Sequence, residues 1–401
     1  MAPPILPAIA ALLATALPSL ATAQAPAPQP AFDRAAWQAD YARLKTALAQ
    51  GYANLDWQVD RRNLNLVGAD RAISAMLDSA ESDVEAVLIF ARLVDAFKDP
   101  HLQLAYGPAP DSVALLPRQS DTAPPLAAAD LCKAANYGSA KPATRLPYTK
   151  AAGWTLVSDG PFQAGMIGET GFLRIPAFGE DRYVDACAKV AQPGLEGREL
   201  QLAVRAELNR QITALIGSMK ARGMKRLAID ISGNGGGSEW SAEVATMLSR
   251  GPLTRQQPRR VSPSCDRTAI WRGERPCDIY GSPPRAETLQ GKGLWTGPLA
   301  VLVDGRSASA SEEFVTLLKD SKRAAIVGAR TFGSGCGYMD GGHAFAFKAA
   351  KMHVMMPNCS RYTAEGINEI EGIAPTVPVD WATLAPTDVP ALIDQSFRTS
   401  L

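Results

Sequence analysis

Two strand–turn–helix segments constrain the fold of this chain more than any other feature. The first, LAIDISGNGGG at 227–237, reads as a strand that ends in a glycine-rich turn. The second joins the strand-like PLAVLVD at 298–304 to SASASEEF at 307–314, which opens a helical pattern. Strands that alternate with helices indicate a parallel sheet covered by helices. A serine at the start of such a helix also lies beside free backbone N–H groups.

The rest of the chain divides into a helical part and an α/β part. Residues 33–98 keep helical spacing of apolar residues and are expected to form an N-terminal helical domain. The helical pattern stops before Pro100, because the residue preceding a proline disfavours helix. His101 is therefore expected at a helix-to-strand transition.

Three further segments complete the expected organisation. Residues 99–170 should hold the strand that carries His101 and then an irregular connection rich in Pro, Ala and Gly. Residues 171–385 should form the α/β core, with a polar insertion at 251–297 and a hairpin made by HAFAFKA and KMHVMMP. Residues 386–401 are expected to be a C-terminal tail or helix.

Composition excludes some functions and leaves the substrate open. The 401 residues are 46% hydrophobic and 20% charged, as is usual for a globular protein. The formal net charge is +1, so no broad basic surface indicates nucleic acid or an anionic membrane as partner.

The N-terminus resembles a secretory signal. An apolar stretch from Ile5 to Leu20 precedes Ala21-Thr22-Ala23, which predicts a signal peptide over 1–23 and a linker over 24–32. The alternative is a disordered Ala/Pro tail. No later segment is long and apolar enough to span a bilayer, so we expect a periplasmic or secreted protein.

Six cysteines suit an exported protein, because an even count favours disulfides in an oxidising compartment. Proximity in sequence suggests Cys265–Cys277 and Cys336–Cys359, which leaves Cys132 to pair with Cys187. The alternative is six buried free thiols. No CxxC motif or His/Cys cluster is present, so no metal site is predicted.

A serine nucleophile needs a base, an orienting group and oxyanion donors. The chain has three histidines. His343 and His353 lie in alternating strand patterns and are expected to be ordinary strand residues. His101, at an element boundary, is the best base candidate, with a capping role as the alternative. Taken singly, SASAS could be a simple helix start and GNGGG a flexible turn.

Taken together, the motifs resemble the tail-specific, or C-terminal processing, peptidase family of serine proteases. The resemblance covers roughly 170–381 and extends more loosely to the N-terminal helices. It rests on GFLRIPAF, LAIDISGNGGG, VLVDGRSASASEEF, KDSKRAAIVGARTFGSG and EIEGIAPTVPVD. The fold that it implies is an N-terminal helical bundle followed by a ClpP/crotonase-like α/β protease core.

By this resemblance Ser309 is the nucleophile, and Ser307 and Ser311 are structural capping groups. The family's Ser–Lys branch has its lysine base 25 residues after the nucleophile, where this chain has Ser334. Asp320 matches a family aspartate of secondary role.

A second, histidine-using branch, which includes tricorn-like proteases, fits better. Its Asp-Gly/Pro-His motif corresponds to His101 after Asp99-Pro100. Its glutamate, shortly before a Gly-Ile/Val-x-Pro segment, corresponds to Glu369, with Glu371 as the alternative. The resemblance thus implies a Ser309–His101–Glu369 triad. Backbone N–H groups of Ala310 and of a glycine at 235–237, with Gly236 as our choice, would hold the oxyanion.

The resemblance also limits what is expected. Many relatives carry a PDZ module before the core, but only about 65 residues separate His101 from Gly171 and they lack strand periodicity. We predict no PDZ module, a protein or peptide substrate, and no cofactor. Oligomeric state is not predicted. The alternatives to an exported serine endopeptidase are a catalytically inactive ligand-binding protein and an esterase-like hydrolase.

Overall fold

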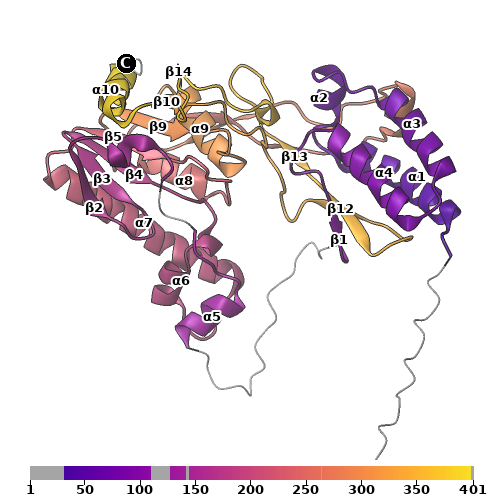
Figure 1. The fold of residues 1–401 in the computed structure, drawn as a ribbon, viewed down its shortest axis with the longest axis horizontal. Coiled ribbons are helices and arrows are strands. Elements are labelled where there is room, and N and C mark those ends of the chain that lie inside the picture. The colour runs from indigo at the N-terminus through magenta and orange to yellow at the C-terminus, as the bar shows by residue number, and fades with distance from the viewer. Residues whose placement is uncertain (1–30, 110–126, 141–143, 263, 399–401) are drawn as a thin grey trace, which may run out of the picture.

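The computed structural model describes residues 31–109, 127–140, 144–262 and 264–398. They form two lobes, one helical with a small sheet and one built on a large mixed sheet (Figure 1). The expected fold class, an N-terminal helical region followed by an α/β core, is confirmed. The signal peptide predicted over 1–23 lies outside the described residues. Among the helices that are described, none combines the length and apolar character needed to cross a bilayer.

The helical lobe packs four helices against a small antiparallel sheet. Its core includes Trp37, Phe90 and Phe347, whose rings meet in tilted and edge-on contacts. The expected hairpin is confirmed as β11 and β12, and β1 adds to it beside β12. The elements are α1 (Arg34–Gly51), α2 (Leu55–Asp60), α3 (Leu66–Ser79), α4 (Asp83–Ala96), β1 (Gln103–Tyr106), β11 (His343–Ala346) and β12 (Met352–Met356).

The large sheet of the described residues has seven strands in the order β14-β10-β9-β5-β4-β3-β2. From β14 to β4 neighbouring strands are parallel, and β3 and β2 add antiparallel at one edge. The strands are β2 (Trp154–Ser158), β3 (Ala164–Ile167), β4 (Thr170–Arg174), β5 (Arg226–Asp230), β9 (Leu299–Val303), β10 (Ala325–Gly328) and β14 (Val377–Pro378).

Helices cover both faces of this sheet, which explains why its central strands are apolar throughout. Ile229 and Val301 pack on the face covered by α7, α8 and α9, whereas Ala228 and Leu302 pack on the face covered by α10. The helices of this lobe are α5 (Ala128–Ala134), α6 (Val184–Val190), α7 (Gly197–Ala221), α8 (Trp240–Met247), α9 (Ala310–Asp320) and α10 (Val389–Arg398).

One sequence expectation is wrong. The segment before 171 was expected to be an irregular connection, yet β2 and β3 lie within it and pair with β4. Both are short strands of four or five residues with small or mixed side chains, such as Gly165, so they show no clear alternation.

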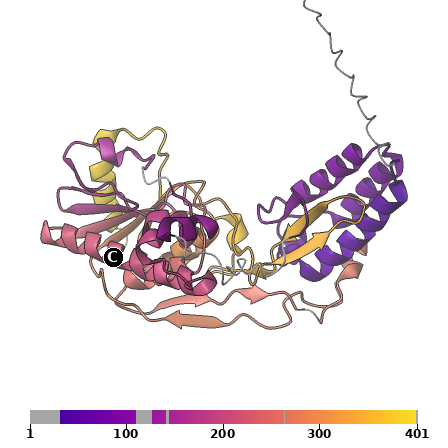
Figure 2. The ribbon, with the colours of Figure 1, turned by 90° about the horizontal axis from the view of Figure 1, so that it is seen from below.

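The polar insertion at 251–297 connects the two lobes along one side of the molecule (Figure 2). Its strands β6 (Leu253–Gln256) and β8 (Ala286–Leu289) pair beside α9, and Arg255 forms an ion pair with Glu313 of that helix. Its 3-10 helix η3 (Thr268–Arg272) lies on the helical lobe, where Trp271 Nε1 donates to the Lys45 carbonyl at 2.9 Å. Between them, β7 (Arg259–Arg260) pairs with β13 (Cys359–Ser360).

All three expected disulfides are present. Cys265 pairs with Cys277 inside the insertion, and Cys132 with Cys187, which ties α5 to α6. The third, between Cys336 and Cys359, ties the loop after β10 to β13.

Candidate active site

Ser309 occupies the turn between β9 and α9, as the N-terminal cap of the helix. Its backbone has φ 57° and ψ −116°, a conformation that non-glycine residues rarely adopt. Strained backbone of this kind persists where the surroundings hold it, and it is concentrated at functional sites.

The two neighbouring serines are structural, as their buried hydroxyls show. Ser307 Oγ donates to the Ile231 carbonyl at 2.9 Å, and Ser311 Oγ donates to the Asn234 carbonyl at 2.9 Å. Both bonds attach the start of α9 to the glycine-rich turn after β5. Of the three serines, Ser309 is the one whose hydroxyl donates no hydrogen bond within the described residues.

Glu312, buried in the first turn of α9, organises the loop at 331–335. Its carboxylate accepts from the Ser309 amide at 2.9 Å and from Thr331 Oγ1 at 2.7 Å. It also accepts from the amides of the next loop residues, at 2.7–2.8 Å: Gly333, Ser334 and Gly335. Burial raises the pKa of Glu312, although these bonds favour its ionised form. One carboxylate thus links the serine to this loop.

The same loop holds the imidazole of His101, which lies between α4 and β1. His101 Nδ1 is 3.0 Å from the Ser334 carbonyl, so a proton on Nδ1 satisfies that acceptor and leaves Nε2 free as a base. A Cβ added to Gly337 would lie 2.7 Å from Nε2, so this glycine permits the ring to approach the loop.

Asp99 fixes the backbone turn that carries His101. The His101 amide donates to Asp99 Oδ1 at 3.0 Å, while Asp99 Oδ2 accepts from Tyr52 and Asn54, both at 2.8 Å. The Tyr338 hydroxyl donates to the His101 carbonyl, and the two rings meet edge-on at 5.4 Å.

Burial lowers the pKa of His101 below its ordinary value, and the Arg361 charge lowers it further. The Asp99 charge and the bond to Ser334 raise this pKa but do not outweigh burial. The imidazole is therefore neutral at pH 7, as a general base requires.

Glu369 does not orient His101 directly, contrary to the expected triad. Within the described residues no hydrogen bond joins the two; instead buried Glu369 accepts from Arg361 Nε at 2.7 Å. Arg361 Nη2 donates to the carbonyls of Ser309 at 2.9 Å and Gly335 at 3.2 Å. Glu369 thus holds the arginine that clamps the serine turn to the loop.

Glu371, the alternative carboxylate, contacts the helical lobe and not the Ser309 turn. It accepts from Trp57 Nε1 and Arg62 Nε, both at 2.7 Å, and so attaches the core to the helical lobe. Burial alone would raise the pKa of Glu371, but these donors outweigh it and the pKa is lowered.

The segment at 359–371 brings the two lobes together at the site. On one side, Asn54 Oδ1 accepts from Ser360 Oγ at 2.6 Å and from Asn368 Nδ2 at 2.9 Å. On the other side, Arg361 contacts the Ser309 turn. Among the described residues no hydrogen bond joins Ser309 Oγ to His101, although one loop holds both residues. Catalytic hydrogen bonds are often long without substrate.

The expected oxyanion donors lie beside the serine, with one change. A Cβ on Gly236 would lie 2.8 Å from Ser309 Cβ and 2.8 Å from the Ala310 amide nitrogen, so the turn and the helix start are adjacent. The Gly236 amide, however, donates to Asn234 Oδ1 at 2.9 Å. The amides of Ala310 and Gly237 have no acceptor within the described residues.

The remaining residues that the sequence singled out lie near Ser309 and His101 or in the surrounding secondary structure. Ser334, at the position of the missing lysine, contributes its backbone carbonyl. Asp320 accepts from the Ala364 amide at 2.7 Å, and burial raises its pKa to about 6. His343 and His353 lie in β11 and β12. No group of side chains suited to hold a metal ion occurs in the part of the chain that the structure describes.

Sequence reasoning missed the roles of Glu312 and Arg361. Ser309 and Glu312 have the Ser-x-x-Glu spacing of a capping box, a signal that predicts the bond from the Ser309 amide. No sequence signal marks Arg361, because its partners come from three separate segments.

Ser309 begins a helix with strained backbone, and the loop at 331–337 binds both this turn and the imidazole of His101. Such an arrangement is typical of serine hydrolases, which act through a nucleophile and a base. The chain belongs to peptidase family S41, whose family model matches residues 169–379. That range includes Ser309 and Glu369 and covers more than half of the chain. The family thus places the chain among the peptidases.

Comparison with known proteins agrees with this class. The chloroplastic C-terminal processing peptidase of Tetradesmus obliquus is 34% identical over 160 residues, which cover 37% of this chain and 30% of that protein. Mature CPAF superposes with a TM-score of 0.58 at 14% identity, covering 90% of this chain and 96% of CPAF. A peptidase-like protein from Parabacteroides merdae gives 0.51 at 15% identity, with coverage of 90% and 96%. The two structures support the fold alone.

Proposed function

We propose that this protein is an exported endopeptidase in which Ser309 is the nucleophile and His101 the general base. The observation that carries the proposal is the loop at 331–337, which holds the Ser309 turn through Glu312 and the imidazole through Ser334. Peptide hydrolysis fits the family and needs no cofactor.

The reaction follows from the protonation states. His101 Nε2 takes the proton of the Ser309 hydroxyl as Oγ attacks the peptide carbonyl, and then gives it to the leaving amine. Water hydrolyses the resulting acyl-enzyme with the same base. The amides of Ala310 and Gly237 are our proposed oxyanion donors, and each donor of this kind typically contributes about 2.7–4 kcal/mol.

The orienting group is the second part of the proposal. The Ser334 carbonyl fixes the His101 tautomer, a role usually given to a carboxylate. Glu369 acts indirectly: it positions Arg361, which donates to the carbonyls of both Ser309 and Gly335. In this account Glu369 is a positioning residue.

The direct test is cleavage of an unfolded protein by the wild type and by Ser309→Ala. The variant should fold normally and cleave nothing above background, and products should map to internal bonds. Ser282→Ala, which removes an exposed hydroxyl in the insertion, is the matched control and should keep full activity. Cleavage that persists in Ser309→Ala would remove this serine from the mechanism.

Export is proposed from the disulfides and from the apolar N-terminal stretch. Disulfides persist in oxidising compartments and are rare in the cytosol. Sequencing the mature N-terminus after expression in a Gram-negative host should give Gln24 in the periplasmic fraction. An intact Met1 in the cytosolic fraction would contradict export.

A further inference from the structure

A pocket of about 600 Å³ opens beside the glycine-rich turn after β5. Residues 235–237 form part of its wall. Because Gly236 lines the pocket and a Cβ on it would lie 2.8 Å from Ser309 Cβ, the pocket and the nucleophile are both adjacent to this turn. A group held in the pocket would therefore lie close to the reacting bond.

The pocket is strongly basic although the chain as a whole carries a formal charge of +1. Its acidic lining residue within the described chain is Asp181, which faces four arginines: Arg145, Arg174, Arg182 and Arg306. A concave surface lined by one sign of charge focuses the electrostatic potential and attracts the opposite charge.

Three of these arginines are available to a ligand. Arg174 is buried, lies 3.3 Å from Asp230, and donates to the Ser232 carbonyl at 2.9 Å. The other three guanidinium groups, of Arg145, Arg182 and Arg306, are exposed and have no ion-pair partner in the ranges that the structure describes.

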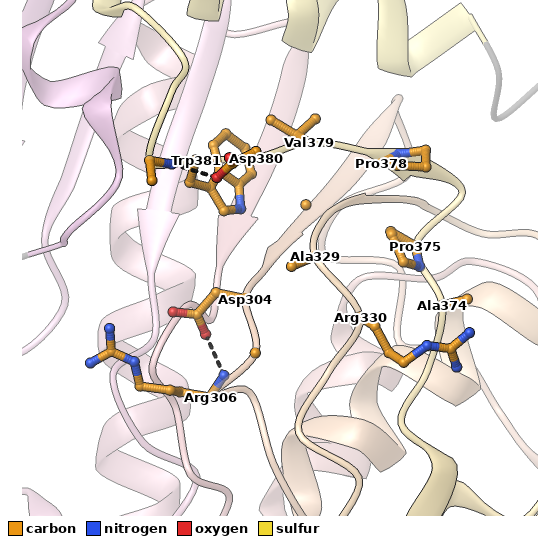
Figure 3. Close-up of a pocket in the computed structure, with 13 residues that line it drawn as sticks. Asp304, Arg306, Ala329, Arg330, Ala374, Pro375, Pro378, Val379, Asp380 and Trp381 are labelled. Carbon is orange, nitrogen blue, oxygen red and sulfur yellow. Dashed lines mark hydrogen bonds between the residues drawn. The ribbon is translucent and has the colours of Figure 1, made fainter.

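The backbone at Arg306 is held by hydrogen bonds to Asp304. Asp304 Oδ1 accepts from the Arg306 amide at 3.0 Å and from the Gly233 amide at 2.8 Å, which joins this loop to the glycine-rich turn. Arg306 also borders a second pocket of about 830 Å³ beyond the ends of β9 and β10, where its guanidinium points away from Arg330 (Figure 3).

We propose that the arginine-lined pocket binds a carboxylate of the substrate next to the scissile bond, so that acidic peptides are preferred. This inference rests on the proposed peptidase function. Guanidinium groups suit the ligand because their planar fork can donate two parallel hydrogen bonds to one carboxylate. The carboxylate can come from an Asp or Glu side chain or from a free C-terminus.

The test measures binding to the Ser309→Ala protein, so that it does not depend on turnover. In the first set, all fluorescent peptides have an amidated C-terminus. The two members of each pair differ only by Asp or Asn at one position, and this position changes from pair to pair. A second pair has a neutral sequence with a free or an amidated C-terminus. In one of the two sets, the peptide with the carboxylate is expected to bind at least about tenfold more tightly than its neutral partner at low salt. Hydrogen bonds to charged groups are among the stronger ones.

The arginines are then removed in the same background. The double variant Arg182→Gln/Arg306→Gln should lose the preference and bind neutral peptides as before. Arg222→Gln is the matched control and should keep the preference, because Arg222 ends α7 ahead of the start of β5, whereas the pocket lies beyond the end of that strand. Equal binding of acidic and neutral peptides in both sets, or a preference that survives the double variant, would overturn the proposal.

Cleavage by the wild type separates this inference from the peptidase function. Cleavage without any charge preference, together with equal binding, removes the carboxylate site and leaves the peptidase intact. A charge preference in binding without cleavage of any peptide supports the site and contradicts the peptidase.

Discussion

At the scale of single residues, the site combines a strained backbone at Ser309 with hydrogen-bonded side chains at the residues around it. The hydroxyls of Ser307 and Ser311 are consumed by backbone carbonyls, and Glu312 accepts five hydrogen bonds. Such networks hold a strained turn that the local sequence alone would not favour.

In the proposed mechanism the protonation state of the buried imidazole sets the pH dependence of activity. Since burial lowers the pKa of His101, the neutral, active form persists below the ordinary value of 6.5. We expect the acid limb of kcat/KM to have its midpoint below pH 6.5. A profile of initial rates against pH measures this, and an acid limb centred above 6.5 would contradict it.

Asp320 should decrease stability above its folded pKa of about 6. The ordinary value is 3.8, so between these pH values the folded state holds more protons and the free energy of unfolding falls as pH rises. The substitution Asp320→Asn keeps an acceptor for the Ala364 amide and removes the charge. Because the side chain is partly exposed, we expect a gain of about 1 kcal/mol at pH 7.5 and none at pH 3.5.

Urea unfolding at the two pH values tests this. Asp394→Asn, an exposed carboxylate of α10, is the control and should show no such pH-dependent gain. A loss of stability at pH 7.5 in Asp320→Asn would show that the carboxylate stabilises the fold.

At the scale of elements, the loop at 331–337 connects groups that lie far apart in the sequence. It is held by Glu312 from α9, by Arg361 after β13, and by the disulfide from Cys336 to Cys359. It presents its carbonyl at 334 and its glycine at 337 to the imidazole from the other lobe. In the proposed mechanism the loop therefore positions both the nucleophile and the base.

Gly337→Ala should misplace the imidazole. The added Cβ would meet His101 Nε2 at 2.7 Å, so the ring must shift. A displacement of about 1 Å can cost 100-fold in rate, so we expect kcat to fall by that order with a small change in KM. Gly217→Ala in α7, where a Cβ meets open space, should keep full activity. Equal kcat for both variants would place the ring elsewhere.

The Cys336–Cys359 disulfide should matter more for activity than for folding. Its replacement by two serines frees the loop from β13, while the hydrophobic cores of both lobes stay intact. We expect kcat/KM to fall at least tenfold, with a stability loss of about 3 kcal/mol for a bridge across 23 residues.

The control for this experiment is the double serine variant of Cys265 and Cys277, a bridge across 12 residues in the insertion. It should lose stability but keep kcat/KM on the remaining folded protein. Similar loss of activity in both variants would mean that the loop has no special dependence on its disulfide.

At the scale of the whole molecule, the site exists only where the lobes meet. His101 belongs to the helical lobe and Ser309 to the α/β lobe, and the segment at 359–371 is bonded to both. The Arg62–Glu371 ion pair adds a contact at the same junction. Substitutions in this junction should therefore alter the distance between the base and the nucleophile, even where the substituted residue contacts neither of them.

The sequence allowed prediction of whatever depends on local pattern. The β9–α9–β10 unit, the hairpin of β11 and β12, and the three disulfide pairs followed from periodicity and proximity. The strands β2 and β3 were missed because they are short and their side chains show no clear alternation. The Arg361 clamp and the Ser334 carbonyl were missed because they depend on contacts between distant segments and on backbone atoms, which have no sequence signature.

The central claim is that His101 activates Ser309 across the junction of the lobes. The most direct measurement is the rate at which a fluorophosphonate labels the folded protein, followed by intact mass and peptide mapping. The account predicts one adduct on Ser309, no adduct on Ser309→Ala, and labelling at least 100-fold slower for His101→Ala. Labelling of His101→Ala at the wild-type rate, or no labelling of the wild type, would contradict it.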